Sequence, residues 1–134
     1  KVTGVQTCAL PISPEAPETP PWAPVALSAG GIPEVSPEWV AAGPGGVRLI
    51  DVREPAEFDG ELGHVPGAEL VPLGAGLDAA DRWDREAPTV LVCRSGGRSG
   101  KAALALLARG FLRVASLRGG MLAWNAQRLP ITRH

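Results

Sequence analysis

The feature that most constrains this fold is a series of short β-branched runs separated by helical segments. Two runs are typical of strands buried on both faces, at 47–52 (VRLIDV) and 89–93 (TVLVC), and a further strand is expected at 114–117 (VASL). The Ala- and Leu-rich stretch 97–109 predicts a helix that Gly110 ends. Strands that alternate with helices over short connections form a mainly parallel sheet with helices on both faces. We therefore expect an α/β protein with three layers.

Shorter elements complete the predicted pattern. Pro33 limits ladder bonding, so the segment around it fits an edge strand. Ser36 followed by Pro37 is typical of a helix start. The expected short elements are an edge strand within 30–36, helices at 36–42, 54–58, 77–83 and 120–127, a loop at 60–67 and a strand at 68–71.

Length, charge and cysteine content exclude several classes of protein. A chain of 134 residues is long enough for one domain. Its net charge is −1, without the basic face that nucleic-acid binding requires. Its apolar runs are far shorter than the roughly 20 residues of a membrane helix. Two cysteines form neither a disulfide framework nor a four-ligand zinc site. We expect no nucleic-acid, membrane or metal partner.

The first 28 residues differ in composition from the rest. They hold six of the 14 prolines and few charges. Residues 2–12 (VTGVQTCALPI) look like a translated sequencing adapter, so we assign 1–13 to an artefact and expect the natural start to be missing. Residues 14–28 are interpreted as a Pro-rich disordered linker, which leaves 29–134 as the domain. We expect a cytoplasmic protein.

The candidate nucleophile is Cys93, at the carboxyl end of the strand TVLVC, where open α/β sheets bind ligands. Gly96 and Gly97 allow a tight turn whose N–H groups form an anion nest. The helix that follows adds its positive N-terminus. Such surroundings favour a reactive thiolate, whereas an isolated strand cysteine would act as a small hydrophobe. The nearby cations are Arg94, Arg98 and Lys101.

Four motifs in order resemble the single-domain rhodanese family, whose members include thiosulfate sulfurtransferases. They are DVREPAEF at 51–58, GHVPGA at 63–68, CRSGGRS at 93–99 and GGMLAW at 119–124. The resemblance implies a rhodanese-like three-layer fold and a persulfide on Cys93, with no metal or organic cofactor. The chain departs from the family at 59–62, where four residues stand in place of the usual two. This longer loop lies near the site and bears on acceptor preference.

The resemblance also implies roles for the residues around Cys93. Arg94 and Arg98 are expected to neutralise the persulfide and to bind the oxyanion of a donor, because Arg suits multi-oxygen anions. Asp51 and Arg53 are expected to support the active loop. The remaining loop residues, expected to contribute backbone donors, are Ser95, Gly96, Gly97 and Ser99, of which Ser99 could instead cap the helix.

Other conspicuous side chains are assigned structural roles. His64 stands in a turn before Pro66, and a thiolate that is already ionised needs no general base. Arg118 is expected to be solvated. The residues assigned to packing are Trp39, Trp83, Met121 and Trp124.

Three functions fit this site. The first is sulfur transfer from a small donor such as thiosulfate to cyanide or a thiol, through one covalent intermediate. The second is a sulfur carrier or docking module that receives persulfide from a partner protein. The third is a cysteine phosphatase or arsenate reductase. That class needs five residues between Cys and Arg to surround a tetrahedral anion, whereas four separate Cys93 from Arg98.

Overall fold

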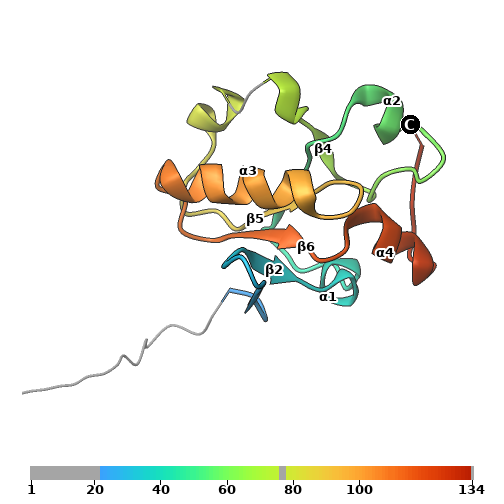
Figure 1. Cartoon of the computed structure of the whole chain (residues 1–134), viewed down its shortest axis with the longest axis horizontal. Coiled ribbons are helices and arrows are strands. Elements are labelled where there is room, and N and C mark those ends of the chain that lie inside the picture. The colour runs from blue at the N-terminus through green and yellow to red at the C-terminus, as the bar shows by residue number, and fades with distance from the viewer. Residues whose placement is uncertain (1–21, 76–77, 134) are drawn as a thin grey trace, which may run out of the picture.

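The computed structural model describes residues 22–75 and 78–133 (Figure 1). In chain order the elements are β1 (Ala26–Leu27), β2 (Pro33–Val35), α1 (Pro37–Ala41), β3 (Arg48–Asp51), α2 (Pro55–Phe58), β4 (Glu69–Leu70), short 3-10 helices (Leu73–Ala75 and Asp78–Arg82), β5 (Thr89–Val92), α3 (Gly97–Ala108), β6 (Val114–Leu117) and α4 (Gly120–Ala126).

The predicted elements are confirmed, with two exceptions. The helix expected at 77–83 is a 3-10 helix over Asp78–Arg82, and residue 77 lies outside the described residues. The strand around Pro33 is not an edge strand, because β2 lies between β1 and β6. Pro33 is tolerated there because it is the first residue of β2 and the parallel pairing with β6 begins only at Glu34.

The strands form one sheet in the order β1-β2-β6-β5-β3-β4. All neighbouring pairs are parallel except β1 with β2. Asp51 at the end of β3 is opposite Val92 at the end of β5. The residues that follow these two strands therefore lie at the same edge of the sheet, as predicted.

Alternate residues of the strands pack into two cores, one on each face of the sheet. On β5, Leu91 and the following Cys93 belong to the core beneath α3, whereas Val90 and Val92 belong to the core that includes α1 and α4. Figure 1 shows α3 on the opposite side of β6 from α1. The three-layer α/β prediction is confirmed. The aromatic and thioether side chains assigned to packing are buried or half-buried, namely Trp39, Trp83, Met121 and Trp124.

The last residues of the predicted linker belong to the domain, which corrects the boundary at 28/29. Ala23 is 4% exposed, and the ring of Trp22 packs edge-on against Trp39 of α1 with 5.8 Å between centroids. Leu27 pairs with β2 through β1. The high proline content concealed this packing, because the contacts are made with residues that are distant in the sequence.

Candidate active site

Cys93 lies in the loop between β5 and α3, at the carboxyl edge of the sheet. Its side chain is 1% exposed and its thiol is free. The loop turns at Gly96, whose φ of 110° is in the left-handed region that favours glycine. The turn allows the Gly96 N–H to donate to Sγ of Cys93 at 3.0 Å, and the Ser99 hydroxyl donates to Sγ at 3.4 Å.

Two opposing effects set the ionisation of Cys93. Burial alone would raise the pKa of the thiol, because a low-dielectric environment disfavours the charged form. The Ser99 hydroxyl and the backbone N–H groups of Ser99, Gly96 and Ser95 outweigh burial and hold the pKa below its ordinary value. The sequence predicted that nearby cations, as well as the loop, stabilise the thiolate. In the structure the main stabilising contacts are the hydrogen bonds of the loop.

Ser99 is fully buried and connects the loop to the sheet. Its Oγ lies 2.6 Å from Oγ of Ser116 on β6 and 3.3 Å from the carbonyl oxygen of Gly96. Gly96 is the N-cap of α3, so Ser99 stands inside the first turn and does not cap the helix. The sequence analysis did not single out Ser116. Its one signal was a hydroxyl in the otherwise apolar strand VASL.

The N-terminus of α4 packs directly against the backbone of the loop. The N–H of Met121 donates to the carbonyl oxygen of Cys93 at 2.8 Å, and that of Leu122 donates to the carbonyl oxygen of Arg94 at 3.0 Å. Gly120 makes this approach possible, because a Cβ atom there would lie 2.5 Å from the Cys93 carbonyl oxygen. The motif GGMLAW therefore holds the backbone of the loop that contains Cys93.

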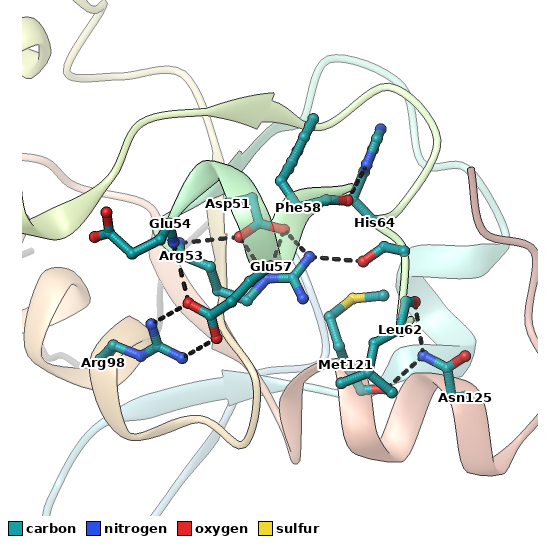
Figure 2. A network of polar contacts seen from close by, with 11 residues as sticks. Asp51, Arg53, Glu54, Glu57, Phe58, Leu62, His64, Arg98, Met121 and Asn125 are labelled. Atoms are coloured by element: carbon teal, nitrogen blue, oxygen red, sulfur yellow. Dashed lines mark hydrogen bonds and ion pairs between the residues drawn. The ribbon is translucent and has the colours of Figure 1, made fainter. Parts of the chain in front are cut away.

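Asp51 and Arg53 form a buried ion pair beside the loop (Figure 2). Arg53 is 1% exposed and donates through Nε and Nη2 to both carboxylate oxygens of Asp51, at 2.7–3.1 Å. Its Nη2 also donates to the carbonyl oxygen of Gly63 at 2.7 Å. The pair thus connects the end of β3 to the loop that follows α2, a placement that fits the expected supporting role.

Arg98 is held by a carboxylate that the sequence analysis did not single out. Its two terminal nitrogens donate to the two oxygens of Glu57 on α2, each at 2.8 Å (Figure 2). The Arg98 hydrogen bond lowers the pKa of Glu57 to about 2, and Glu57 raises the pKa of Arg98 in turn. The guanidinium expected to bind a donor oxyanion is therefore already paired. The signal for Glu57 was its place in the motif DVREPAEF.

A cleft of about 220 Å³ opens beside the loop. Arg94, the residue expected to meet the donor, lines this cleft with an exposed side chain. The longer loop noted in the sequence forms another part of the wall. The lining residues are Arg53, Ala56, Glu57, Gly60, Glu61, Leu62 and Arg94.

Side chains from the C-terminal part of the chain hold this longer loop in place. Asn125 of α4 donates to the carbonyl oxygen of Leu62 at 3.1 Å (Figure 2). Arg133 donates to the carbonyl oxygens of Gly60 at 3.1 Å and Glu61 at 2.6 Å. Three consecutive carbonyl groups therefore accept hydrogen bonds from distant side chains. The wall of the cleft is fixed by these contacts in addition to local turn geometry.

His64 is buried away from the cleft lining. Its ring stacks on Phe58 with 3.5 Å between centroids, and Nδ1 lies 2.8 Å from the Phe58 carbonyl oxygen. Its backbone pairs with Thr132 near the C-terminal end. These contacts fit the expected structural role. Arg118, with a side chain 49% exposed, is solvated and lies 3.5 Å from Glu34.

The described residues contain neither a cluster of metal ligands nor a helix able to cross a membrane. Within 22–75 and 78–133, no group of three or more His, Cys, Asp and Glu side chains is arranged to hold a metal ion. None of the helices in these ranges has the length and apolar character that crossing a bilayer requires.

A mainly parallel α/β sheet with a buried cysteine in the loop after a central strand, its sulfur facing a loop N–H, defines a class of cysteine-loop α/β domains. Within that class, residues 36–127 match the family described as the rhodanese-like domain. The match covers more than half of the chain, so this chain belongs to the rhodanese family. The resemblance drawn from the four motifs is thus confirmed.

Curated relatives carry sulfurtransferase names. The chain is 38% identical over 85 residues to a sulfurtransferase of Allochromatium vinosum, covering 63% of this chain and 78% of the relative. It is 36% identical over 81 residues to the thiosulfate sulfurtransferase GlpE of Pseudomonas putida, covering 60% and 72%. It is 38% identical over 80 residues to the uncharacterized protein YqhL of Bacillus subtilis, of which it spans 62%.

Solved structures support the fold. A rhodanese-like domain protein of Staphylococcus aureus is 27% identical, with a TM-score of 0.63 over 73% of this chain and 96% of its own. A thiosulfate sulfurtransferase of Pseudomonas aeruginosa is 26% identical, with a TM-score of 0.64 over 74% of this chain. The match covers 20% of that longer protein.

Proposed function

We propose that this protein transfers a sulfane sulfur from a donor such as thiosulfate to cyanide or a thiol through a persulfide on Cys93. The observation that carries the proposal is the position of Sγ, which accepts hydrogen bonds from the Gly96 N–H and the Ser99 hydroxyl. A thiolate held in this way is the nucleophilic form of cysteine. The names of the curated relatives support the same reaction class.

The reaction consists of two displacements at sulfur. The Cys93 thiolate attacks the outer sulfur of thiosulfate, a new S–S bond forms on Sγ, and sulfite leaves with the electron pair of the broken S–S bond. Cyanide or a thiolate then attacks the outer sulfur of the persulfide. The bond to Sγ breaks, the Cys93 thiolate returns, and thiocyanate or a new persulfide departs. These steps need no metal or organic cofactor, and they predict ping-pong kinetics.

The phosphatase alternative is disfavoured by the same loop. Four residues separate Cys93 from Arg98, and Arg98 is engaged by Glu57 rather than left to hold a tetrahedral phosphate. A short loop around a single sulfur atom suits persulfide chemistry better. We place the reaction in the cytoplasm, where a reducing environment preserves a free thiol.

The test is sulfur loading of Cys93, followed by mass spectrometry. Wild-type protein incubated with thiosulfate is expected to gain the mass of one sulfur atom and to produce thiocyanate when cyanide is added. Cys93→Ser is expected to fold normally and to gain nothing. Sulfur loading of that variant, or no loading of the wild type by any sulfane donor, would contradict the proposal.

A second measurement separates an enzyme from a sulfur carrier. Turnover of thiosulfate and cyanide is compared with persulfide exchange between the loaded protein and a protein thiol. Multiple turnovers with small molecules indicate an enzyme. A single loading, followed by transfer only to a protein thiol, would instead identify a carrier that receives sulfur from a partner protein.

A further inference from the structure

We propose that Glu57 makes this site discriminate against dianionic oxyanion donors such as thiosulfate, by holding Arg98, and that the preferred donor is a persulfide without an oxyanion. The inference rests on the proposed sulfur transfer and names its donor class. Glu57 acts through Arg98 and is therefore a positioning residue.

The ion pair between Glu57 and Arg98 is fixed at both ends. Both oxygens of Glu57 accept from Arg98 at 2.8 Å, in a bidentate geometry. Oε1 of Glu57 also accepts from the backbone N–H of Glu54 at 3.1 Å, at the start of α2. Arg98 stands in the first turn of α3, one residue after the start of the helix. The carboxylate is therefore anchored by its own helix and leaves Arg98 little freedom to meet a second anion.

Among the side chains that line the cleft, the remaining charges balance each other. Arg53 is compensated by Asp51 at 2.7 Å, with both side chains almost completely buried. Arg94 and Glu61 line the cleft and form no ion pair with a described residue. Thiosulfate, with two negative charges, therefore meets one uncompensated cation and one uncompensated carboxylate. A cleft that favours binding of that dianion would be lined by more cations than carboxylates.

A hydropersulfide of an uncharged thiol avoids this penalty. The Cys93 thiolate attacks its outer sulfur, the S–S bond of the donor breaks, and the thiolate that leaves takes the proton from the transferred sulfur. No oxyanion develops on the leaving group. The loop N–H groups at Cys93 suffice for the sulfur anion itself, since Gly96 donates to Sγ at 3.0 Å.

The test compares two donors with the variant Glu57→Gln. We expect kcat/KM with thiosulfate to rise roughly tenfold, the effect of freeing one charged hydrogen-bond donor, while kcat/KM with benzyl hydropersulfide changes less than about twofold. The double variant Glu57→Gln with Arg98→Gln is expected to lose the gain. An equal change with both donors, or a gain that persists without Arg98, would overturn the inference.

Glu61→Gln is the matched control, because it removes the same charge from the same cleft without touching Arg98. Its gain with thiosulfate is expected to be smaller than that of Glu57→Gln and to be unaffected by Arg98→Gln. If the two glutamates behave alike in both backgrounds, the effect is one of overall charge, and the role given to the Glu57–Arg98 pair is wrong.

A binding measurement keeps this inference separate from the reaction. Calorimetric titration of thiosulfate into Cys93→Ser involves no chemistry, and adding Glu57→Gln is expected to tighten binding roughly tenfold. If wild-type protein forms no persulfide with either donor, the proposed reaction is wrong. The calorimetric comparison still decides whether Glu57 weakens thiosulfate binding. Should Glu57→Gln not fold, Arg94→Gln is expected to weaken thiosulfate binding several times more than Arg98→Gln. An equal loss from both would overturn the inference.

Discussion

At Cys93, burial and hydrogen bonding act on the thiol in opposite directions. Burial excludes water and disfavours the thiolate, whereas the Ser99 hydroxyl and nearby backbone N–H groups favour it. These donors are fixed by the Gly96 turn and by the contact between Ser99 and Ser116. The pKa of the thiol therefore depends on the precise position of neutral hydrogen-bond donors rather than on one adjacent full charge.

Replacement of Ser99 by Ala is expected to raise the pKa of Cys93. The variant loses the hydroxyl that donates to Sγ, so the rate of sulfur transfer should move to higher pH. It also leaves the buried Ser116 hydroxyl without its partner, at a cost of about 1–3 kcal/mol in the free energy of unfolding. The pH dependence of thiol alkylation and a urea titration measure the two effects.

Ser116→Ala provides the control for this prediction. It removes the same contact from the other side but leaves the Ser99 hydroxyl able to donate to Sγ. We expect a loss of stability with a smaller shift of the alkylation profile. If Ser99→Ala leaves the alkylation profile unchanged, the hydroxyl does not stabilise the thiolate.

Among the elements, α2 and α4 position the loop although neither contains Cys93. The start of α4 binds the carbonyl groups of Cys93 and Arg94. The short helix α2 supplies Glu57 to Arg98 on α3. Each contact joins segments that are far apart in the sequence, so the active loop depends on how the elements pack.

Gly120→Ala is expected to destabilise the protein by about 2 kcal/mol or more and to reduce persulfide formation. The new Cβ would lie 2.5 Å from the Cys93 carbonyl oxygen, and the φ of 58° disfavours a side chain. Gly46→Ala is the control, since its φ of 77° is strained but nothing lies within 4 Å of its Cβ. Chemical denaturation should show a clearly larger loss for Gly120. Equal losses would mean that backbone strain alone, and not contact with the loop, accounts for the loss of stability in Gly120→Ala.

The pair between α2 and α3 predicts how stability responds to acid. The pKa of Glu57 is lowered from 4.5 to about 2 in the folded protein, so its contribution is present above pH 4.5 and is lost as the pH falls toward 2. Glu57→Gln lacks this titration. Its free energy of unfolding should therefore decline less than that of the wild type between these pH values. Parallel curves in urea titrations at several pH values would contradict the prediction.

Across the whole molecule, the two ends of the described chain complete the structure around a central sheet. The segment at 22–27 packs Trp22 and Ala23 on the face that carries α1, and its strand β1 extends the edge of the sheet. At the other end, Thr132 pairs with His64 and Arg133 binds the loop beside the cleft. Figure 1 shows the C-terminus close to α2.

Deletion of residues 1–28 is expected to lower the free energy of unfolding by about 2 kcal/mol or more, because it removes a Trp pair and a buried Ala. Sulfur transfer below the melting temperature should be largely retained, since Trp22 packs on α1 and β1 pairs with β2. Deletion of 1–13, the predicted adapter, should leave the melting temperature unchanged. If the longer deletion is equally neutral, the packing of Trp22 on Trp39 contributes little.

The sequence specified most of the fold because hydrophobic period and turn residues are local signals. The runs VRLIDV, TVLVC and VASL predicted three central strands, and the Gly-rich segment after Cys93 predicted the turn. The edge position of β2 was predicted wrongly, because proline composition does not reveal which strand pairs on the other side. The predicted boundary between linker and domain was wrong for the same reason, since Trp22 contacts Trp39 only in the folded protein.

By itself, the sequence determined the class of fold and the family and indicated Cys93 as the candidate nucleophile, since these depend on residue type and order along one strand, loop and helix. Only the tertiary structure decided which groups surround Cys93 and which charges are free. Glu57 and Arg98 are 41 residues apart, and Ser99 and Ser116 are 17 apart. Their contacts depend on the packing of α2, α3 and β6. A pairing of this kind has no local signature, because it is fixed by the distance between elements rather than by the residues next to it.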